Sequence, residues 1–305
     1  MNLVRLIQTK KMTILPFIAA LLLIFTACMQ STSQSAIALE KGSVNVAEKG
    51  GIKIHTYMSD KLQATHIIES KNSLVLVDSQ FFASFAKEFR AYADSLNKPI
   101  ERVIISHSHP DHFLGLGAGF ADVKDKIYAL SGTKAFSDKA GPGMFKNMKK
   151  RLGDALADQF VGPSQVLKTG TTKIDGITYE FKELKDGEAG QQLLIKLPDL
   201  NTLIVQDLVY NNLHSYLANN TFDNWIAILE SLQNLAGYDT VLPGHGKPAD
   251  INVLASQIAY LKDAKTILAE VDNGKAFKAR IMKKYPNLAG ENYIDISLYG
   301  LFPNQ

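Results

Sequence analysis

The feature that most constrains this chain is a run of three histidines and one aspartate within residues 107–112, directly after the apolar residues 103–105. The apolar residues predict a buried strand. Residues two apart on a strand point to the same side, so His107 and His109 can direct both imidazoles at one point. The whole chain has seven histidines, and three of them lie in this run.

Asp111 and His112 lie beyond Pro110, where we expect the strand to turn, so these two side chains can point elsewhere. The pattern therefore fits two adjacent metal sites better than one. Neutral imidazole and carboxylate groups are ligands that hold zinc in proteins. The alternative is a polar surface turn, but such a turn gives no reason for four metal-binding groups to follow a buried strand. We therefore predict a metal centre here.

The composition is that of a globular protein without a nucleic-acid partner. Of the 305 residues, 46% are hydrophobic and 21% are charged, which is enough for a substantial core. The net charge is +3, from 33 basic and 30 acidic residues. Residues 1–27 hold three of the basic residues and no acidic one, so the rest of the chain is balanced. This balance argues against a nucleic-acid-binding face.

The N-terminus predicts export. Residues 1–27 combine a basic start with the apolar stretch 12–25, which is too short to span a bilayer comfortably, and we expect a signal peptide. Residues 23–28 resemble a bacterial lipobox ending at Cys28, the only cysteine, so we expect membrane attachment through a lipid on Cys28 and location in the periplasm or cell envelope. The alternative is a cleaved signal followed by an incidental cysteine.

Residues 28–50 are rich in Ser, Ala and Gly, and we interpret them as a tether preceding a domain at 51–305. Apolar periodicity predicts strands and helices in alternating groups. Expected strands cover 52–58, 64–69, 73–77, 102–105, 126–130, 166–167, 171–174, 177–184, 191–197, 202–205 and 239–242; expected helices cover 81–96, 133–139, 144–160, 222–235 and 251–271, with two shorter ones at the end. Gly141-Pro142-Gly143 predicts a break between two of these helices. The order indicates an α/β (α+β) fold with two sheets face to face and helices outside.

Two further positions place a metal-binding side chain just after an expected strand. Asp207 follows the apolar residues 203–205, and His245 follows 241–242 in the loop Pro243-Gly244-His245-Gly246. The glycines beside His245 allow the backbone to pass close to a bound ion. These residues are candidate partners for the first motif.

Over about residues 50 to 250 the chain resembles the metallo-β-lactamase superfamily, whose metal-binding motifs follow one another in the same order. The matching residues are His107-Ser108-His109-Pro110-Asp111-His112, Asp207 and Pro243-Gly244-His245-Gly246. The resemblance implies a four-layer αβ/βα sandwich with one or two Zn²⁺ ions at one edge. It implies one metal on His107 and His109, a second on Asp111, His112 and His245, and Asp207 bridging the two.

The family's usual third histidine of the first site is absent, and Glu188 lines up with its position. One hypothesis is that Glu188 is a ligand, since carboxylate oxygen binds zinc as imidazole nitrogen does. A second is a mononuclear centre on Asp111, His112 and His245, and a third is a protein without catalysis. A glutamate adds negative charge and could favour Mn²⁺ or Fe²⁺ over zinc. Gln206 also differs from the family's usual glycine.

The resemblance implies metal-assisted hydrolysis of a small-molecule substrate, with metal ions that lower the pKa of a bound water. Asp111 would orient that water and handle a proton, and His214 would contact the substrate as electrophile or proton donor. The alternative for His214 is an exposed loop histidine without a role in the site. We expect an exported hydrolase of a small ester, lactone, thioester or amide. The alternatives are a β-lactam or phosphodiester hydrolase and a non-catalytic metal-binding lipoprotein. The oligomeric state is open.

Overall fold

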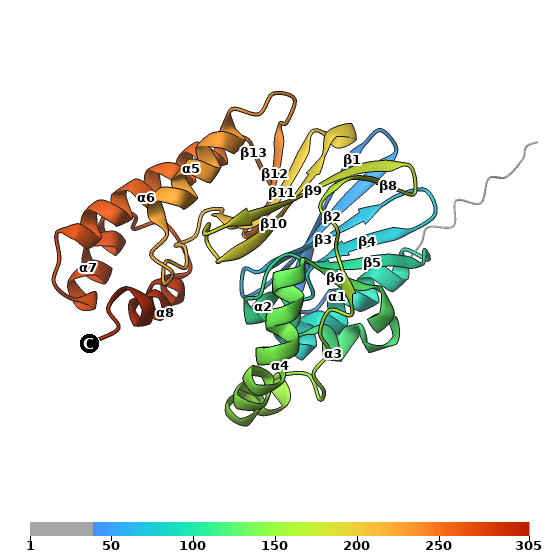
Figure 1. The fold of residues 1–305 in the computed structure, drawn as a ribbon, viewed down its shortest axis with the longest axis horizontal. Helices are drawn as coiled ribbons and strands as arrows, with labels where there is room; N and C mark the ends of the chain where they lie inside the picture. Colours follow the sequence, from blue (N-terminus) through green and yellow to red (C-terminus); the bar gives the residue numbers. More distant parts are fainter. Residues whose placement is uncertain (1–38, 305) are drawn as a thin grey trace, which may run out of the picture. The chain divides into compact units, whose positions relative to one another are not determined.

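A computed structural model describes residues 39–304, and its strands form two sheets (Figure 1). The expected signal peptide and Cys28 lie outside the described residues. The first sheet has the order β1-β2-β3-β4-β5-β6-β7, with β1 Gly42–Lys49, β2 Ile52–Ser59, β3 Ala64–Glu69, β4 Leu74–Val77, β5 Ile100–Ile105, β6 Ile127–Ala129 and β7 Gln165–Val166. The second has the order β13-β12-β11-β10-β9-β8, with β8 Gly170–Ile174, β9 Ile177–Lys185, β10 Gln191–Leu197, β11 Thr202–Tyr210, β12 Thr240–His245 and β13 Ala249–Asp250.

In the described part of the chain, eight α-helices lie outside the two sheets (Figure 1). Those beside the first sheet are α1 Ala83–Ser95, α2 Pro110–Phe113, α3 Leu116–Gly119 and α4 Ser131–Leu152. Beside the second sheet are α5 Phe222–Gln233 and α6 Val253–Ala269, and α7 Gly274–Lys284 and α8 Glu291–Leu301 follow at the far end of α6. Within residues 39–304, no helix combines the length and the apolar character needed to cross a membrane.

Alternation along the strands produces the layers. In β4, Leu74 and Leu76 pack in the cluster that contains Phe89 of α1. Val75 and Val77 point the other way, into a cluster built from strands of both sheets. The chain therefore buries one core between the sheets and one core under each helical layer. The predicted four-layer αβ/βα sandwich is confirmed.

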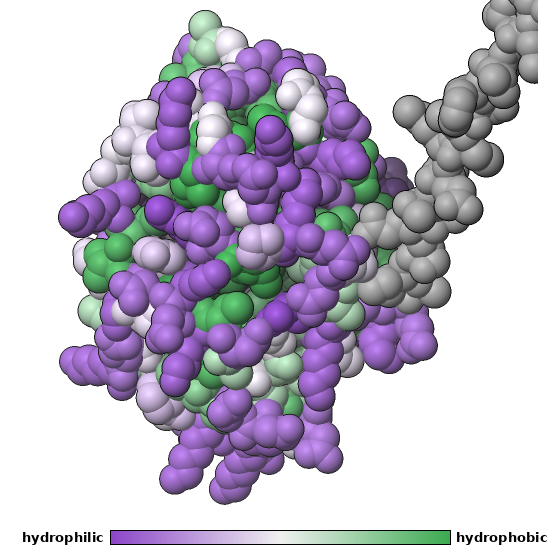
Figure 2. All heavy atoms as spheres, turned by 90° about the vertical axis from the view of Figure 1, so that its right-hand side faces the viewer, coloured by the Kyte–Doolittle hydropathy of each residue, from purple (hydrophilic) through white to green (hydrophobic). Residues whose placement is uncertain are grey.

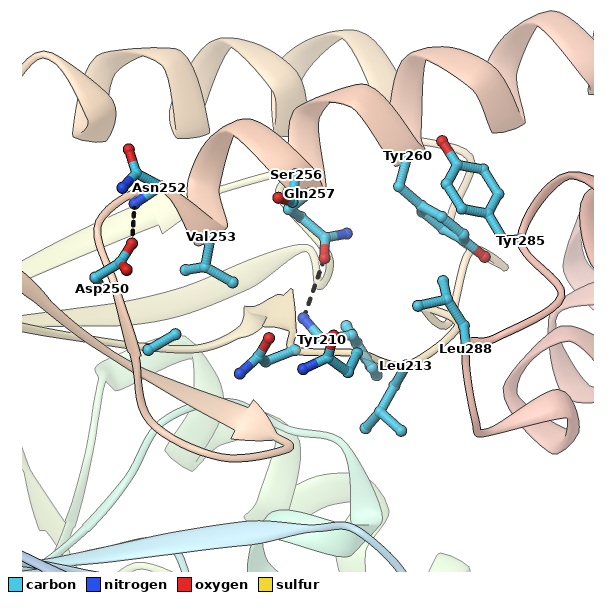
Figure 3. A pocket seen from close by; sticks show the side chains of 13 residues that line it. Tyr210, Leu213, Asp250, Asn252, Val253, Ser256, Gln257, Tyr260, Tyr285 and Leu288 are labelled. Atoms are coloured by element: carbon cyan, nitrogen blue, oxygen red, sulfur yellow. Dashed lines mark hydrogen bonds between the residues drawn. The ribbon is translucent and has the colours of Figure 1, made fainter.

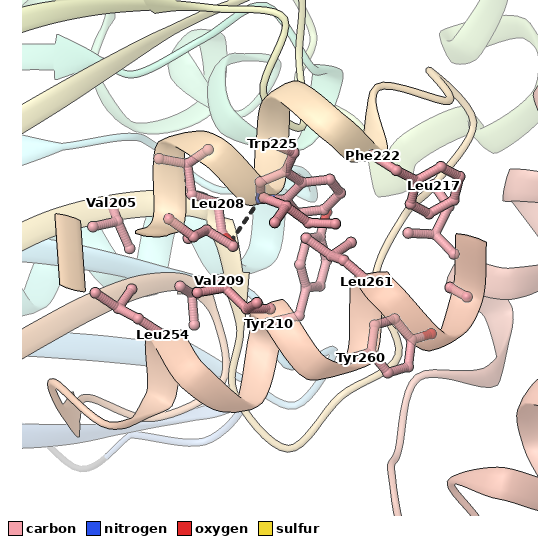
Figure 4. Packing of buried hydrophobic residues seen from close by; sticks show 14 of the residues in the cluster. Val205, Leu208, Val209, Tyr210, Leu217, Phe222, Trp225, Leu254, Tyr260 and Leu261 are labelled. Carbon is pink, nitrogen blue, oxygen red and sulfur yellow. Dashed lines mark hydrogen bonds between the residues drawn. The ribbon is translucent and has the colours of Figure 1, made fainter. Parts of the chain in front are cut away.

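The strand β11 is buried along its entire length and runs through the middle of the second sheet. On its helical side, Leu208 and Val209 pack with Trp225 of α5 and Leu261 of α6 (Figure 4). The indole Nε1–H of Trp225 donates a hydrogen bond to the carbonyl oxygen of Leu208 at 3.0 Å. A functional side chain on β11 is therefore carried by a fully buried strand that packs against two helices.

The interpretation of residues 28–50 as a tether is wrong for 42–49. These residues form β1, paired antiparallel with β2 from Gly42 opposite Ser59 to Lys49 opposite Ile52. The turn is Gly50-Gly51, with φ values of +61° and +77°, and a turn with two positive φ angles matches the twist of a hairpin. Most of β1 is exposed, so the strand lacks the apolar pattern by which buried strands are identified.

The break predicted at Gly141-Pro142-Gly143 is also wrong, because α4 continues through it and ends earlier than expected, at Leu152. A Cβ atom at position 141 would lie 2.5 Å from the Phe160 ring, so this glycine is required for close packing and not for a turn. The helix ends before Gly153, whose φ is +54°.

The face in Figure 2 carries mainly hydrophilic side chains, with apolar side chains in smaller areas between them. This is the ordinary surface of a folded domain.

Candidate metal centre

The donor residues lie at strand ends and in the loops beside them, except Asp207, which lies within β11 because this strand continues past its expected end at residue 205 to Tyr210. His107 follows β5 and forms an isolated β-bridge with Gln192 of β10, which ties the two sheets together at this edge. Beyond it, the short helix α2 begins at Pro110, which suits the first position of a helix. This turn redirects the backbone and presents Asp111 and His112 separately from the two preceding histidines, as the sequence predicted.

Two groups of donor atoms result, and both include Asp207. The atoms of each group lie within 4.8 Å of one another. The first group is His107, His109, Glu188 and Asp207, and the second is Asp111, His112, Asp207 and His245. All seven residues identified from the sequence as candidate ligands are therefore brought together, whereas their role as ligands stays a prediction.

The Oδ2 atom of Asp207 lies between the two groups. It is 3.2 Å from Nε2 of His112, 3.2 Å from Nε2 of His245 and 3.7 Å from Nε2 of His107. This carboxylate oxygen is the geometric link that a bridging ligand would provide.

Glu188 takes the position in the first group that the sequence left in doubt. Its Oε2 atom is 3.3 Å from Nδ1 of His109 and 3.8 Å from Nε2 of His107. Gln192 holds the loop, because its Oε1 accepts a hydrogen bond from the Glu188 backbone N–H at 3.0 Å. Glu188 is 1% exposed, so its carboxylate is enclosed and directed at the histidines.

The donor set fits a divalent metal ion. Donors of a tetrahedral zinc ion lie about 3.3–3.6 Å apart, close to the separations found here. Nε2 of His107, Nε2 of His112 and Oε2 of Glu188 are buried and make no hydrogen bond within the described part of the chain. Buried polar atoms are normally paired, so several that converge without a partner are explained by an ion between them.

The electrostatics of the cluster also favour a cation. Burial lowers the pKa of His112, but Asp207 and Asp111 outweigh it and hold this pKa well above its ordinary value. For His245, burial is likewise outweighed by Asp207, and the pKa is raised to about 9. Burial raises the pKa of Glu188. Carboxylates that favour protonated imidazoles in this way equally favour a metal ion in place of those protons.

Gly244 allows the backbone beside His245 to pass close to the carboxylate of Asp207. A Cβ atom at this position would lie 1.9 Å from Oδ1 of Asp207. The glycine beside His245 was expected to let the backbone approach an ion, and the structure shows that it makes room for the carboxylate of Asp207.

Asp78, at the end of β4, was not selected from the sequence. It is fully buried with φ +63°, accepts hydrogen bonds from the backbone N–H and the hydroxyl of Ser106 at 2.8 Å each, and lies 2.7 Å from Nδ1 of His112. Gln206, also at positive φ (+45°), donates its side-chain N–H to Asp78, which explains what this departure from the family's glycine does. Asp78 shares the strand-end position of the chosen residues, and that signal could have identified it.

Tyr210 is a second residue that sequence reasoning missed. Its hydroxyl donates to Oδ2 of Asp207 at 3.0 Å and lies 3.3 Å from Oε1 of Glu188, and its ring stacks on His245 with centroids 4.7 Å apart. Tyr210 also lines a cavity of about 330 Å³ under α6, where Gln257 accepts its backbone N–H (Figure 3). None of the seven donor residues lines this cavity.

His214 is buried, with its Nδ1 3.1 Å from the hydroxyl of Tyr260 and its backbone N–H donating to Ala289. The alternative of an exposed loop histidine is therefore wrong, and a catalytic role stays a prediction. In the same loop it is Tyr216 whose ring contacts a donor residue, His109, with centroids 5.3 Å apart.

The sequence of this chain is similar to those of known metallo-beta-lactamases and alkylsulfatases. A linear primary-alkylsulfatase from a Pseudomonas species is 24% identical over an alignment of 244 residues, which covers 65% of this chain and 45% of that protein. A metallo-beta-lactamase type 2 from a Bacillus species is 24% identical over 245 residues, covering 76% of this chain and 88% of that protein. The chain spans less than half the length of the alkylsulfatases it matches.

Among solved structures, the sec-alkyl sulfatase PisA1 has a TM-score of 0.61 at 20% identity, covering 87% of this chain and 51% of its own. This likeness shows the shared fold. The model of the metallo-beta-lactamase superfamily matches residues 60–245, a span that begins before β3 and ends at His245. The chain therefore belongs to the metallo-beta-lactamase superfamily.

Proposed function

We propose that this chain is a metal-dependent hydrolase of a small-molecule ester. The observation that carries the proposal is that Oδ2 of Asp207 lies within reach of two groups of buried metal-binding atoms. Two ions held in this way would polarise the scissile group and lower the pKa of water at neutral pH. Zn²⁺ is our first choice, with Mn²⁺ or Fe²⁺ favoured if the extra charge of Glu188 dominates.

The donor residues differ in how far their side chains are exposed to solvent, and this difference indicates from which side a substrate reaches the site. His107, His112 and Asp207 are nearly inaccessible, whereas the side chains of His109 and Asp111 are 22% and 30% exposed. Substrate and water therefore approach from the side of His109 and Asp111. Asp111 is placed to orient the attacking water and to pass a proton to the leaving group. Tyr210 donates its hydroxyl to the Asp207 carboxylate and so holds it in place.

A sulfuric acid ester of an alkyl alcohol is our first substrate class, ahead of carboxylic esters, lactones, thioesters and amides. This choice is supported by the names of the relatives, since alkylsulfatases recur among them. It is also supported by coverage, because the likeness to PisA1 extends over 87% of this chain. A β-lactam is the second candidate, favoured by the match to 88% of a metallo-beta-lactamase.

The test is to purify the protein, measure zinc, manganese and iron per chain, and assay alkyl sulfates, lactones, thioesters, β-lactams and phosphodiesters with each ion. We expect two ions per chain and turnover of an alkyl sulfate. Two bound ions without turnover of any substrate would support the non-catalytic metal-binding lipoprotein, and absence of bound metal would refute the proposal.

We further propose that the protein is exported and anchored to the envelope through Cys28, on the basis of the N-terminal sequence. Cells expressing the wild type should retain it in the membrane fraction, and Cys28→Ser should release it. A wild type that fractionates with cytosolic proteins would contradict the proposal.

A further inference from the structure

The two donor groups contain four histidines. Three of them direct Nε2 toward Asp207 and have an oxygen atom within hydrogen-bond distance of Nδ1. An imidazole that binds a metal through Nε2 carries its proton on Nδ1, so the group at Nδ1 fixes the tautomer and the ring orientation. The three Nδ1 contacts are His107 with Ser106 at 2.9 Å, His112 with Asp78 at 2.7 Å and His245 with Tyr293 at 2.8 Å.

Tyr293 differs from the other two partners in its origin. Ser106 and Asp78 lie within residues 60–245, which match the superfamily, whereas Tyr293 lies on α8, outside that span. Its ring also packs against the site, with its centroid 5.0 Å from that of His245 and 5.4 Å from that of Tyr210. A C-terminal helix therefore reaches the second group directly.

The start of α8 is fixed to the segment that follows β11. The backbone N–H of Ala289 donates to Asn212, and the N–H of His214 donates to Ala289, at 3.2 and 2.9 Å. Farther along the helix, the hydroxyl of Ser297 accepts the backbone N–H of Leu217 at 2.7 Å. Tyr293 lies between these two attachments, so its position relative to His245 is set by the backbone on both sides.

We propose that Tyr293 is a positioning residue for His245, and that α8 thereby completes the second donor group. The phenolic oxygen of Tyr293 accepts the Nδ1–H of His245, which leaves Nε2 free to bind an ion. Without this acceptor, the Nδ1–H would be buried unpaired or the proton would move to Nε2, where it blocks binding. The inference rests on the metal-dependent function proposed above.

The test is Tyr293→Phe in the full chain, which removes the oxygen and keeps the ring, with Tyr299→Phe on the same helix as control. Tyr299 is 81% exposed, so its hydroxyl has no part in the site. Zinc affinity is measured by competition with a chelator, and melting of the metal-free protein by circular dichroism. We expect Tyr293→Phe to weaken binding of one of two ions by about 10–100-fold. The control should match the wild type in affinity, and circular dichroism should show a cooperative melting transition for both metal-free variants.

Unchanged affinity for both ions in Tyr293→Phe would overturn the inference and leave the proposed function standing. A wild type that binds no ion would overturn both. Nitrogen NMR of the zinc-loaded wild type gives a second test that does not depend on how the variant folds. It should show the proton of His245 on Nδ1, and a proton on Nε2 would overturn the inference.

Discussion

The two donor groups share Asp207 but differ in the support that the chain gives them. In the second group, His112 has the Asp78 carboxylate at its outer nitrogen and His245 has a tyrosine hydroxyl. In the first group, His107 has only the hydroxyl of Ser106. A carboxylate partner raises the basicity of a metal-bound imidazole more than a hydroxyl does. The second group is therefore the better supported of the two.

The first group has the same number of carboxylates as the second, but its own carboxylate is more deeply buried than Asp111 of the second. It holds Glu188 in place of the family's usual histidine, and Glu188 is buried with a pKa raised by burial. A buried carboxylate is costly unless a cation lies beside it, so this group depends more strongly on its ion. The chemical identity of a ligand and the hydrogen bonds that hold it in place are therefore two different means of stabilising a bound metal. The following variants change one of them at a time.

The largest effect is expected from Asp207→Asn, because this residue belongs to both groups. Losing the charge at Oδ2 should release at least one ion and weaken the other, with activity reduced about a thousandfold or more. Metal content by mass spectrometry and steady-state kinetics check this. Asp199→Asn, on the surface between β10 and β11, should bind metal as the wild type does. Two tightly bound ions in Asp207→Asn would show that the groups are independent.

Glu188→Gln should act on the first group alone. The amide keeps the size of the side chain and removes its charge, so we expect one ion to remain and activity to fall about a hundredfold. Glu188→His is the matched variant, since it restores the family's usual donor and should retain two ions. Equilibrium dialysis distinguishes the cases. Two ions bound by Glu188→Gln with unchanged affinity would exclude Glu188 as a ligand, and one ion in the wild type would support the mononuclear hypothesis.

Asp78→Asn tests the support of the second group. Asp78 accepts hydrogen bonds from Ser106 and Gln206 besides its contact with His112, and an amide cannot accept all of them. We expect metal affinity to fall about 10–100-fold. The metal-free protein should also lose about 1–3 kcal/mol of unfolding free energy in urea, because buried groups lose their partners. An affinity loss without a stability loss would show that Asp78 acts only through the metal.

The sequence identified the layers and six of the seven donor residues because local rules govern them, whereas Glu188 came only from the resemblance to the family. Strand alternation and the break at Pro110 set the directions of His107, His109 and Asp111, and the end of β12 sets that of His245. The third donor of the first group, Glu188, could be aligned but not assigned, since its orientation depends on Gln192 from the next strand.

Tyr210 and Tyr293 could not be predicted because long-range packing places them. Tyr210 lies on β11, where the register with β12 shifts between Gln206 and Tyr210, so strand alternation does not give its direction. Tyr293 reaches His245 only through the docking of α8. The strand β1 was missed for a different reason, since an exposed edge strand lacks a buried face to mark it.

The smallest effect is expected from Ser106→Ala, which removes the neutral support of His107. The serine hydroxyl lies 2.9 Å from Nδ1 of His107 and donates to Asp78 at 2.8 Å, so it relays the same carboxylate to the first group. We expect zinc affinity of one ion to fall about tenfold or less, below the effect of Asp78→Asn. Chelator competition on both variants gives the ranking. If Ser106→Ala equals Asp78→Asn, the carboxylate acts on the metals mainly through Ser106, and the first group is as strongly supported as the second.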